Sequence, residues 1–172
     1  MLSKLRTRLA AMGTVKQLLE EAERIATERG AHRAAAEHLV LAALALPDGA
    51  ARRTFERLGR SPDDFAAALE EQEADDLRQV GVEAPLEAIN AQVPSSGAPT
   101  GIYRSEVSAQ QLFQSAGEDA RRHGGNLSGA HVLRAAANLE HGVVARALRR
   151  SGIDRDQLRD AATEEIERPP TT

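Results

Sequence analysis

The second half of this 172-residue chain repeats the first half. With an offset of 93 positions and no gap, His131 falls on His38 and Arg146 on Arg53. Further matched pairs are Leu46 with Leu139, Gly49 with Gly142, Phe55 with Leu148, Gly59 with Gly152, and Phe65 with Leu158. A chain made of two copies of one pattern is predicted to fold as two similar units.

Each copy is predicted to form four helices, of which the second should be the central one. The first helix, at about 15–29 and 108–123, has apolar or small residues at helical spacing. The second begins near Ala35 in one copy and near Ser128 in the other. It is apolar nearly all round, and a helix of that kind is expected to be buried.

Glycines and helix-starting residues delimit the third and fourth helices. The third helix is predicted to follow Gly49 or Gly142 and to end at Gly59 or Gly152. The fourth starts at Ser61-Pro62 or at Asp154, where a capping side chain precedes acids in the first turn. These four glycines, with His38 and His131, are the structural markers of the repeat.

Composition favours an all-α fold. Hydrophobic residues make up 41% of the chain but aromatic residues only 2%, and no stretch alternates like a strand. Alanine and long charged side chains lose little entropy in a helix. We therefore expect two four-helix repeats related by pseudo-twofold symmetry and packed as one globular unit.

The regions outside the repeats have a different composition. Between the copies lie seven acids over 70–87, followed by the coil-forming stretch PSSGAPTG at 94–101. A short helix is expected at about 82–89. We predict a helical extension over 1–14, a first repeat over 15–69, an acidic extension with short helix and linker over 70–105, a second repeat over 106–167, and a disordered tail over 168–172.

Charge and motif content exclude several functional classes. The net charge is −4 and there is no cysteine, which disfavours nucleic-acid binding and rules out thiolate chemistry. The chain contains neither G-x-x-x-x-G-K-[ST] nor G-x-S-x-G, and no apolar run long enough for a bilayer. We expect a cytoplasmic protein without catalytic residues, metal, cofactor, nucleic-acid partner or membrane contact.

One local group of arginines stands out near the C-terminus. Its members are Arg146, Arg149, Arg150, Arg155 and Arg159. We interpret them as a solvated helix face balanced by the nearby Asp154, Asp156 and Asp160. A nucleic-acid surface is the alternative.

The pair Glu37-His38 opens the first central helix and suggests an acid–base or ligand site. The second copy keeps the histidine as His131 but has Ala130 in place of the glutamate. We therefore interpret both histidines as buried and hydrogen-bonded to backbone. Glu37 is either a first-turn acid, which the helix dipole favours by about 0.3–1 kcal/mol, or a ligand-binding residue.

The doubled pattern resembles the Clp N-terminal domain, the double Clp repeat that precedes the ATPase modules of bacterial Clp unfoldases. The family motif G-T-E-H-[LI]-L stands here as A-A-E-H-L-V at 35–40 and as S-G-A-H-V-L at 128–133. The basic pair that the family has ahead of the second repeat is replaced within 105–111. The chain looks like a stand-alone copy of this domain.

The resemblance implies a non-enzymatic module that binds protein substrates or adaptors for a Clp-type AAA+ unfoldase or its peptidase. In some members the motif glutamate of each repeat holds phosphoarginine, so Glu37 is the implied ligand residue and one site per chain is expected. The sequence leaves open an adaptor, a decoy that competes for clients or binds small molecules, and, as rivals, a small helical hydrolase and a DNA-associated regulator.

Overall fold

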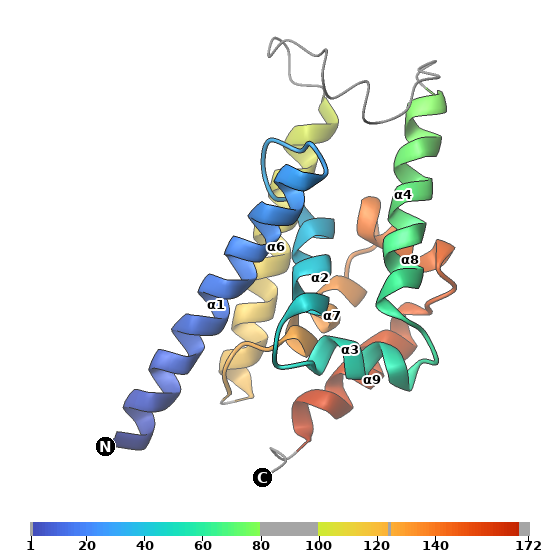
Figure 1. Cartoon of the computed structure of the whole chain (residues 1–172). Coiled ribbons are helices and arrows are strands. Elements are labelled where there is room, and N and C mark those ends of the chain that lie inside the picture. The colour runs from blue at the N-terminus through green and yellow to red at the C-terminus, as the bar shows by residue number, and fades with distance from the viewer. Residues whose placement is uncertain (1, 80–99, 124, 169–172) are drawn as a thin grey trace.

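The computed structural model describes residues 2–79, 100–123 and 125–168, and within them every regular element is a helix. The first repeat contains α1 (Leu2–Glu28), α2 (Ala36–Ala45), α3 (Ala50–Arg57) and α4 (Pro62–Gln79). The second repeat contains α6 (Thr100–Arg122), α7 (Gly129–Ala137), α8 (Val143–Arg150) and α9 (Arg155–Glu167) (Figure 1). The expected all-α class is confirmed.

Three helices are longer than the sequence predicted. α1 begins at Leu2, because the helical extension predicted over 1–14 is continuous with the helix expected at 15–29, and α6 begins at Thr100, inside the predicted linker. α4 continues through the acidic residues to Gln79, past the predicted end of the first repeat at residue 69. The short helix expected at 82–89, most of the linker and the tail beyond Arg168 lie outside the described residues.

The predicted starts of the fourth helices are confirmed. Ser61 and Asp64 cap α4 reciprocally: Asp64 N donates to Ser61 Oγ (3.2 Å) and Ser61 N donates to Asp64 Oδ2 (2.8 Å). Asp154 Oδ1 accepts from the backbone N–H of both Asp156 and Gln157 at 3.0 Å. Each bond satisfies an N–H that has no partner within the helix.

Gly59 and Gly152 end the third helices as expected. Their φ angles are 64° and 68°, in the left-handed region that glycine enters without steric cost. The chain can therefore turn sharply from α3 into α4 and from α8 into α9.

The two repeats interlock through their third helices. The central helices α2 and α7 contact each other, and each contacts the first helix of its own repeat. α3 packs on α7 and α9 of the second repeat, whereas α8 packs on α2 and α4 of the first. Figure 1 shows α8 beside α4 and α3 beside α9. The result is one unit with pseudo-twofold symmetry, and surfaces between α2 and α8 belong to both halves.

The core is built from alanine and aliphatic side chains around one aromatic pair. Most of α2 and α7 is buried, as the all-round apolar sequence predicted. Phe55 of α3 and Phe65 of α4 are fully buried and meet edge to face, with ring centroids 6.2 Å apart and planes at 86°. Leu148 and Leu158, also fully buried, take the equivalent places in the second repeat.

Ion pairs across the two halves correct the interpretation of the arginine group. Arg150 bonds Glu71 (2.8 Å) and Asp75 (2.6 Å) of α4, and Arg57 bonds Glu164 of α9 at the matching position (2.7 Å). Of the acids predicted to balance the group, Asp156 pairs with Arg159 (2.8 Å), while Asp154 caps α9. The acids that pair with Arg146 and Arg150 lie on α4, which the sequence assigned to a separate extension.

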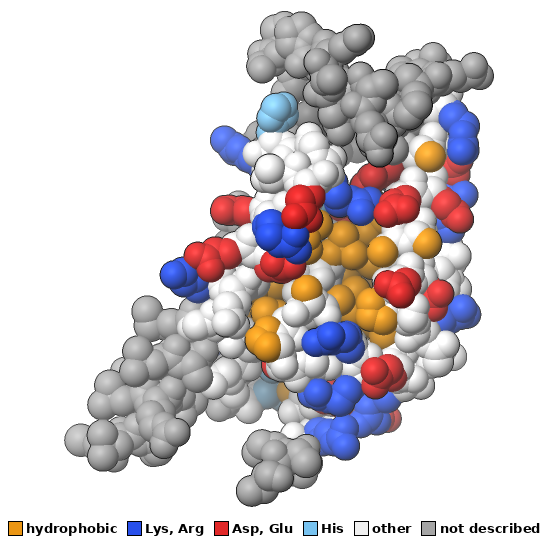
Figure 2. Space-filling view, in the orientation of Figure 1, with side chains coloured by type: hydrophobic (Ala, Val, Ile, Leu, Met, Phe, Trp, Pro, Cys, Tyr) orange, Lys and Arg blue, Asp and Glu red, His pale blue; other side chains and the backbone are white. Residues whose placement is uncertain are grey.

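Figure 2 shows how these charges are distributed over one face of the molecule. Hydrophobic side chains gather at its centre, between α1 and α4, and acidic and basic side chains surround them. No helix in the described part of the chain is both long and apolar enough to cross a membrane.

Candidate functional site

Glu37 lies in a cavity of about 650 Å³ that is formed by both repeats. Glu37 belongs to the first turn of α2. The loop between α7 and α8, the first turn of α8, and single residues of α4 and α6 complete the lining. The lining residues are Ala36, Glu37, Asp76, Ser108, Leu139, His141, Gly142, Val143, Val144 and Arg146.

The carboxyl group of Glu37 is held in an environment that disfavours its charge. Burial raises its pKa above the ordinary value, and the nearby Glu73 adds to the rise. A hydrogen bond from its own backbone N–H and the positive charges of Arg29 and Arg146 lower the pKa but do not offset burial. A cation that entered the cavity would compensate this partly buried charge, so Glu37 is placed to receive one.

The same cavity also has groups that attract an anion. The first backbone N–H groups of a helix have no partner within the helix and lie at its positive end. Both α2, through Ala36, and α8, through Val143 and Val144, begin at the cavity wall. Arg146 adds a guanidinium group whose nearest carboxylate, Asp76, is 3.4 Å away, and its Nε is buried without a hydrogen-bond partner.

Cation-binding and anion-binding groups therefore share one cavity. A ligand that contains both charges can use all of them, since a carboxylate accepts from a guanidinium while helix N-termini donate to a phosphate. Sequence reasoning identified Glu37 but missed Arg146, His141 and Asp76 as its neighbours. The only available signal was the match of Arg146 to Arg53, which does not reveal that α8 packs on α2.

The two motif histidines make the backbone hydrogen bond that the sequence suggested. His38 Nδ1 accepts from Ala35 N at 2.9 Å, and His131 Nδ1 accepts from Ser128 N at 3.2 Å. Burial lowers the pKa of His38 to about 4, and it lowers the pKa of His131 as well. Both rings are therefore neutral at pH 7 and each closes the start of a central helix.

The second repeat lacks a counterpart of Glu37. Ala130 is fully buried at that position, and its neighbour Gly129 is in close contact with the first repeat. The remaining markers have local roles: Gly49 and Gly142 are the residues that precede α3 and α8. Within residues 2–79, 100–123 and 125–168 there is no group of three His, Asp or Glu side chains able to hold a metal ion.

We expect Gly129→Ala to destabilise the protein by about 1–3 kcal/mol, the usual cost of overpacking. A Cβ at this position would lie 2.8 Å from Ala51 Cβ and 2.9 Å from Ala43 O, so α7 would have to move away from the first repeat. Urea denaturation followed by circular dichroism measures the change. Gly117→Ala is the matched control, because its Cβ would meet nothing within 4 Å and alanine favours a helix interior by about 1 kcal/mol. Equal stability of the two variants would contradict the tight contact.

Comparison with known protein families agrees with the division of the fold into two repeats. The family model of the Clp repeat (R) N-terminal domain matches residues 13–92 and 105–172. No curated protein matches the chain. The two matched ranges together span most of the sequence and coincide with the two interlocked halves, so the chain belongs to the Clp repeat N-terminal domain family.

Proposed function

We propose that the chain is a non-enzymatic binding module that docks proteins or peptides through the cavity at Glu37. The observation that supports this most is the meeting of a partly buried carboxylate, two helix N-termini and Arg146 in one cavity. The ligand class that fits is an arginine-type side chain with an anionic substituent. Phosphoarginine, the ligand that the family resemblance implies, has this chemistry.

Each half of such a ligand has a partner in the cavity. Its guanidinium group would replace water around Glu37 and pair directly with this partly buried carboxylate. Its phosphate would accept from the N–H groups at the starts of α2 and α8 and would draw Arg146 from the weak contact with Asp76. Ligand binding of this kind would account for a partly buried acid with a raised pKa at the wall of a cavity.

We expect Glu37→Gln to weaken the binding of a phosphoarginine peptide about thirty-fold. A hydrogen bond to a charged group contributes about 2 kcal/mol, and each 1.4 kcal/mol is about tenfold in affinity. Isothermal titration calorimetry measures the loss. Glu56→Gln is the matched control, because Glu56 is an exposed glutamate on α3, outside the cavity.

The same variant is expected to remain folded. Because burial raises the pKa of Glu37, its charge opposes folding at neutral pH, and the neutral glutamine should raise the unfolding temperature there. This gain in unfolding temperature should vanish below pH 4.5, the ordinary glutamate pKa, because Glu37 is then protonated in both the folded and the unfolded protein. Equal affinity of wild type and Glu37→Gln would remove Glu37 from the site, and no binding by wild type would remove the ligand.

Two biological roles are compatible with this binding activity. An adaptor brings its clients to a Clp-type AAA+ unfoldase and its peptidase, whereas a decoy holds clients, adaptors or small molecules away from them. A degradation assay with the separate unfoldase distinguishes the roles: added chain speeds client loss if it is an adaptor and slows it if it is a decoy. Glu37→Gln should remove either effect.

A further inference from the structure

A second cavity, of about 470 Å³, lies where pseudo-symmetry places a copy of the first. The first cavity is lined by the starts of α2 and α8, and the second by Ser128, which precedes α7, and by Ala50, which begins α3. With the offset of 93, Arg53 in the second cavity corresponds to Arg146 in the first. Asp48 likewise corresponds to His141. The two cavities therefore share the wall formed by the start of a third helix and the loop before it, and differ in the residues of that wall.

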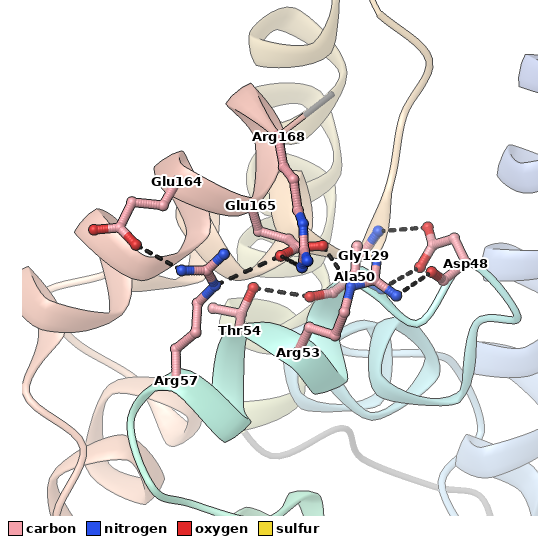
Figure 3. Close-up of polar contacts among 9 residues, drawn as sticks. All are labelled: Asp48, Ala50, Arg53, Thr54, Arg57, Gly129, Glu164, Glu165 and Arg168. Atoms are coloured by element: carbon pink, nitrogen blue, oxygen red, sulfur yellow. Dashed lines mark hydrogen bonds and ion pairs between the residues drawn. The ribbon is translucent and has the colours of Figure 1, made fainter. Parts of the chain in front are cut away.

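A single carboxylate joins the two helix N-termini of the second cavity. Asp48 Oδ1 accepts from Ala50 N at 2.9 Å, and Asp48 Oδ2 accepts from Gly129 N at 2.9 Å (Figure 3). Asp48 belongs to the first repeat and Gly129 to the second, so this side chain also connects the halves. In the first cavity the equivalent residue, His141, is exposed and carries no carboxylate.

The guanidinium group of Arg53, in the second cavity, also has hydrogen-bond partners within the chain. Arg53 Nε donates to Glu165 Oε1 at 2.5 Å, and Arg53 Nη1 donates to the backbone oxygen of Asp48 at 3.0 Å. Glu165 is almost fully buried, with Arg57 and Arg168 at 3.6 and 3.7 Å from its other oxygen. Figure 3 shows these side chains converging from α3, from α9 and from Arg168, which follows α9. The groups that bind an anion are thus taken by the chain's own carboxylates.

The lining of the second cavity nevertheless includes buried polar atoms that have no hydrogen-bond partner. His131 and Glu165 both line it and both are more than nine-tenths buried, and His131 Nε2 and Glu165 Oε2 have no hydrogen-bond partner. We propose that Asp48 is an internal ligand that closes the second cavity to anions, which leaves the chain with one open site. The role of Asp48 deepens the proposed function. It rests on that function in one respect, namely that the first cavity is the open site.

The test is to remove the carboxylate and to follow inorganic phosphate by amide chemical shifts. Asp48→Ser keeps a hydroxyl oxygen that can cap α3 but cannot also reach Gly129 N. In this variant phosphate should shift the amide resonances of Gly129 and Ala50 in a saturable manner. In wild type the same resonances should not move at equal phosphate concentration.

Asp48→Asn is the second variant, because it keeps the shape of the side chain and one accepting oxygen, while its amide nitrogen cannot accept from Gly129. A folded protein whose Gly129 resonance ignores phosphate in both variants would overturn the proposal, as would a wild-type Gly129 that responds like the variants. The amides of Ala36 and Val143 report on the first cavity in the same spectra. If the proposed function fails, the amides of Ala36 and Val143 will not respond to phosphate, whatever Gly129 does. That result is distinct from failure of the Asp48 proposal, which is read at Gly129.

Discussion

Phe55→Ala is expected to lower the free energy of unfolding by about 4 kcal/mol. Phe55 is fully buried, and its ring meets Phe65 edge to face at the junction of α3 and α4. The substitution removes most of a buried ring, leaves a cavity and breaks an aromatic contact that contributes about 0.5–1.5 kcal/mol in addition to its buried area. Since a domain of this size is stable by only about 5–15 kcal/mol, the variant should lose a large part of its total stability.

Urea denaturation followed by circular dichroism at 222 nm measures the loss. The second repeat supplies the control, because Leu148 stands at the position equivalent to Phe55 and is equally buried. Phe55→Leu should therefore cost clearly less than Phe55→Ala. A loss below about 1 kcal/mol for the alanine variant would show that the aromatic pair is dispensable.

The second large effect is a loss of stability in acid that depends on His38. Burial, with a smaller contribution from Arg29, lowers the pKa of the folded ring from 6.5 to about 4. Between these values the unfolded chain binds a proton that the folded protein does not, so the free energy of unfolding falls as the pH falls. The full contribution of this residue is about 3 kcal/mol, reached near pH 4.

His38→Gln isolates this contribution. A glutamine at the third position of the helix can still accept from the backbone N–H of Ala35, as in a capping box, but it does not titrate. Wild type should lose more stability than the variant between pH 6.5 and 4, and the two should be parallel above pH 7. Curves that stay parallel over the whole range would contradict the assignment.

Local sequence was enough to predict the order of the helices, the starts of α4 and α9 and the ends of α3 and α8. Ser61, Asp154, Gly59 and Gly152 act on residues within a few positions of themselves, so their side chain or backbone preference predicts the local structure. The histidine bond at the start of each central helix is equally local. Comparison of the two copies supported these helix ends and histidine bonds, since a pattern that occurs twice is rarely accidental.

Contacts between the halves could not be predicted in this way. Asp48 resembles an ordinary loop acid until Gly129, 81 positions away, is found beside it. The acids of α4 seemed to form a separate extension because their arginine partners lie on α8. The cavity at Glu37 has the same origin, since its second wall is the start of α8. Each of these features depends on how the third helices cross to the other repeat.

This crossing of the third helices has a consequence for how the molecule could diverge. An interface in which α3 packs on α9 and α8 packs on α4 is of the kind that relates identical subunits in a twofold homodimer. A homodimer of single repeats would have to carry the same residue at both equivalent positions. Fusion of the two copies in one chain removes that restraint, so one position can hold Glu37 and the other Ala130, one Asp48 and the other His141. Covalent duplication is thus what allows two equivalent places in a symmetric scaffold to acquire different chemistry.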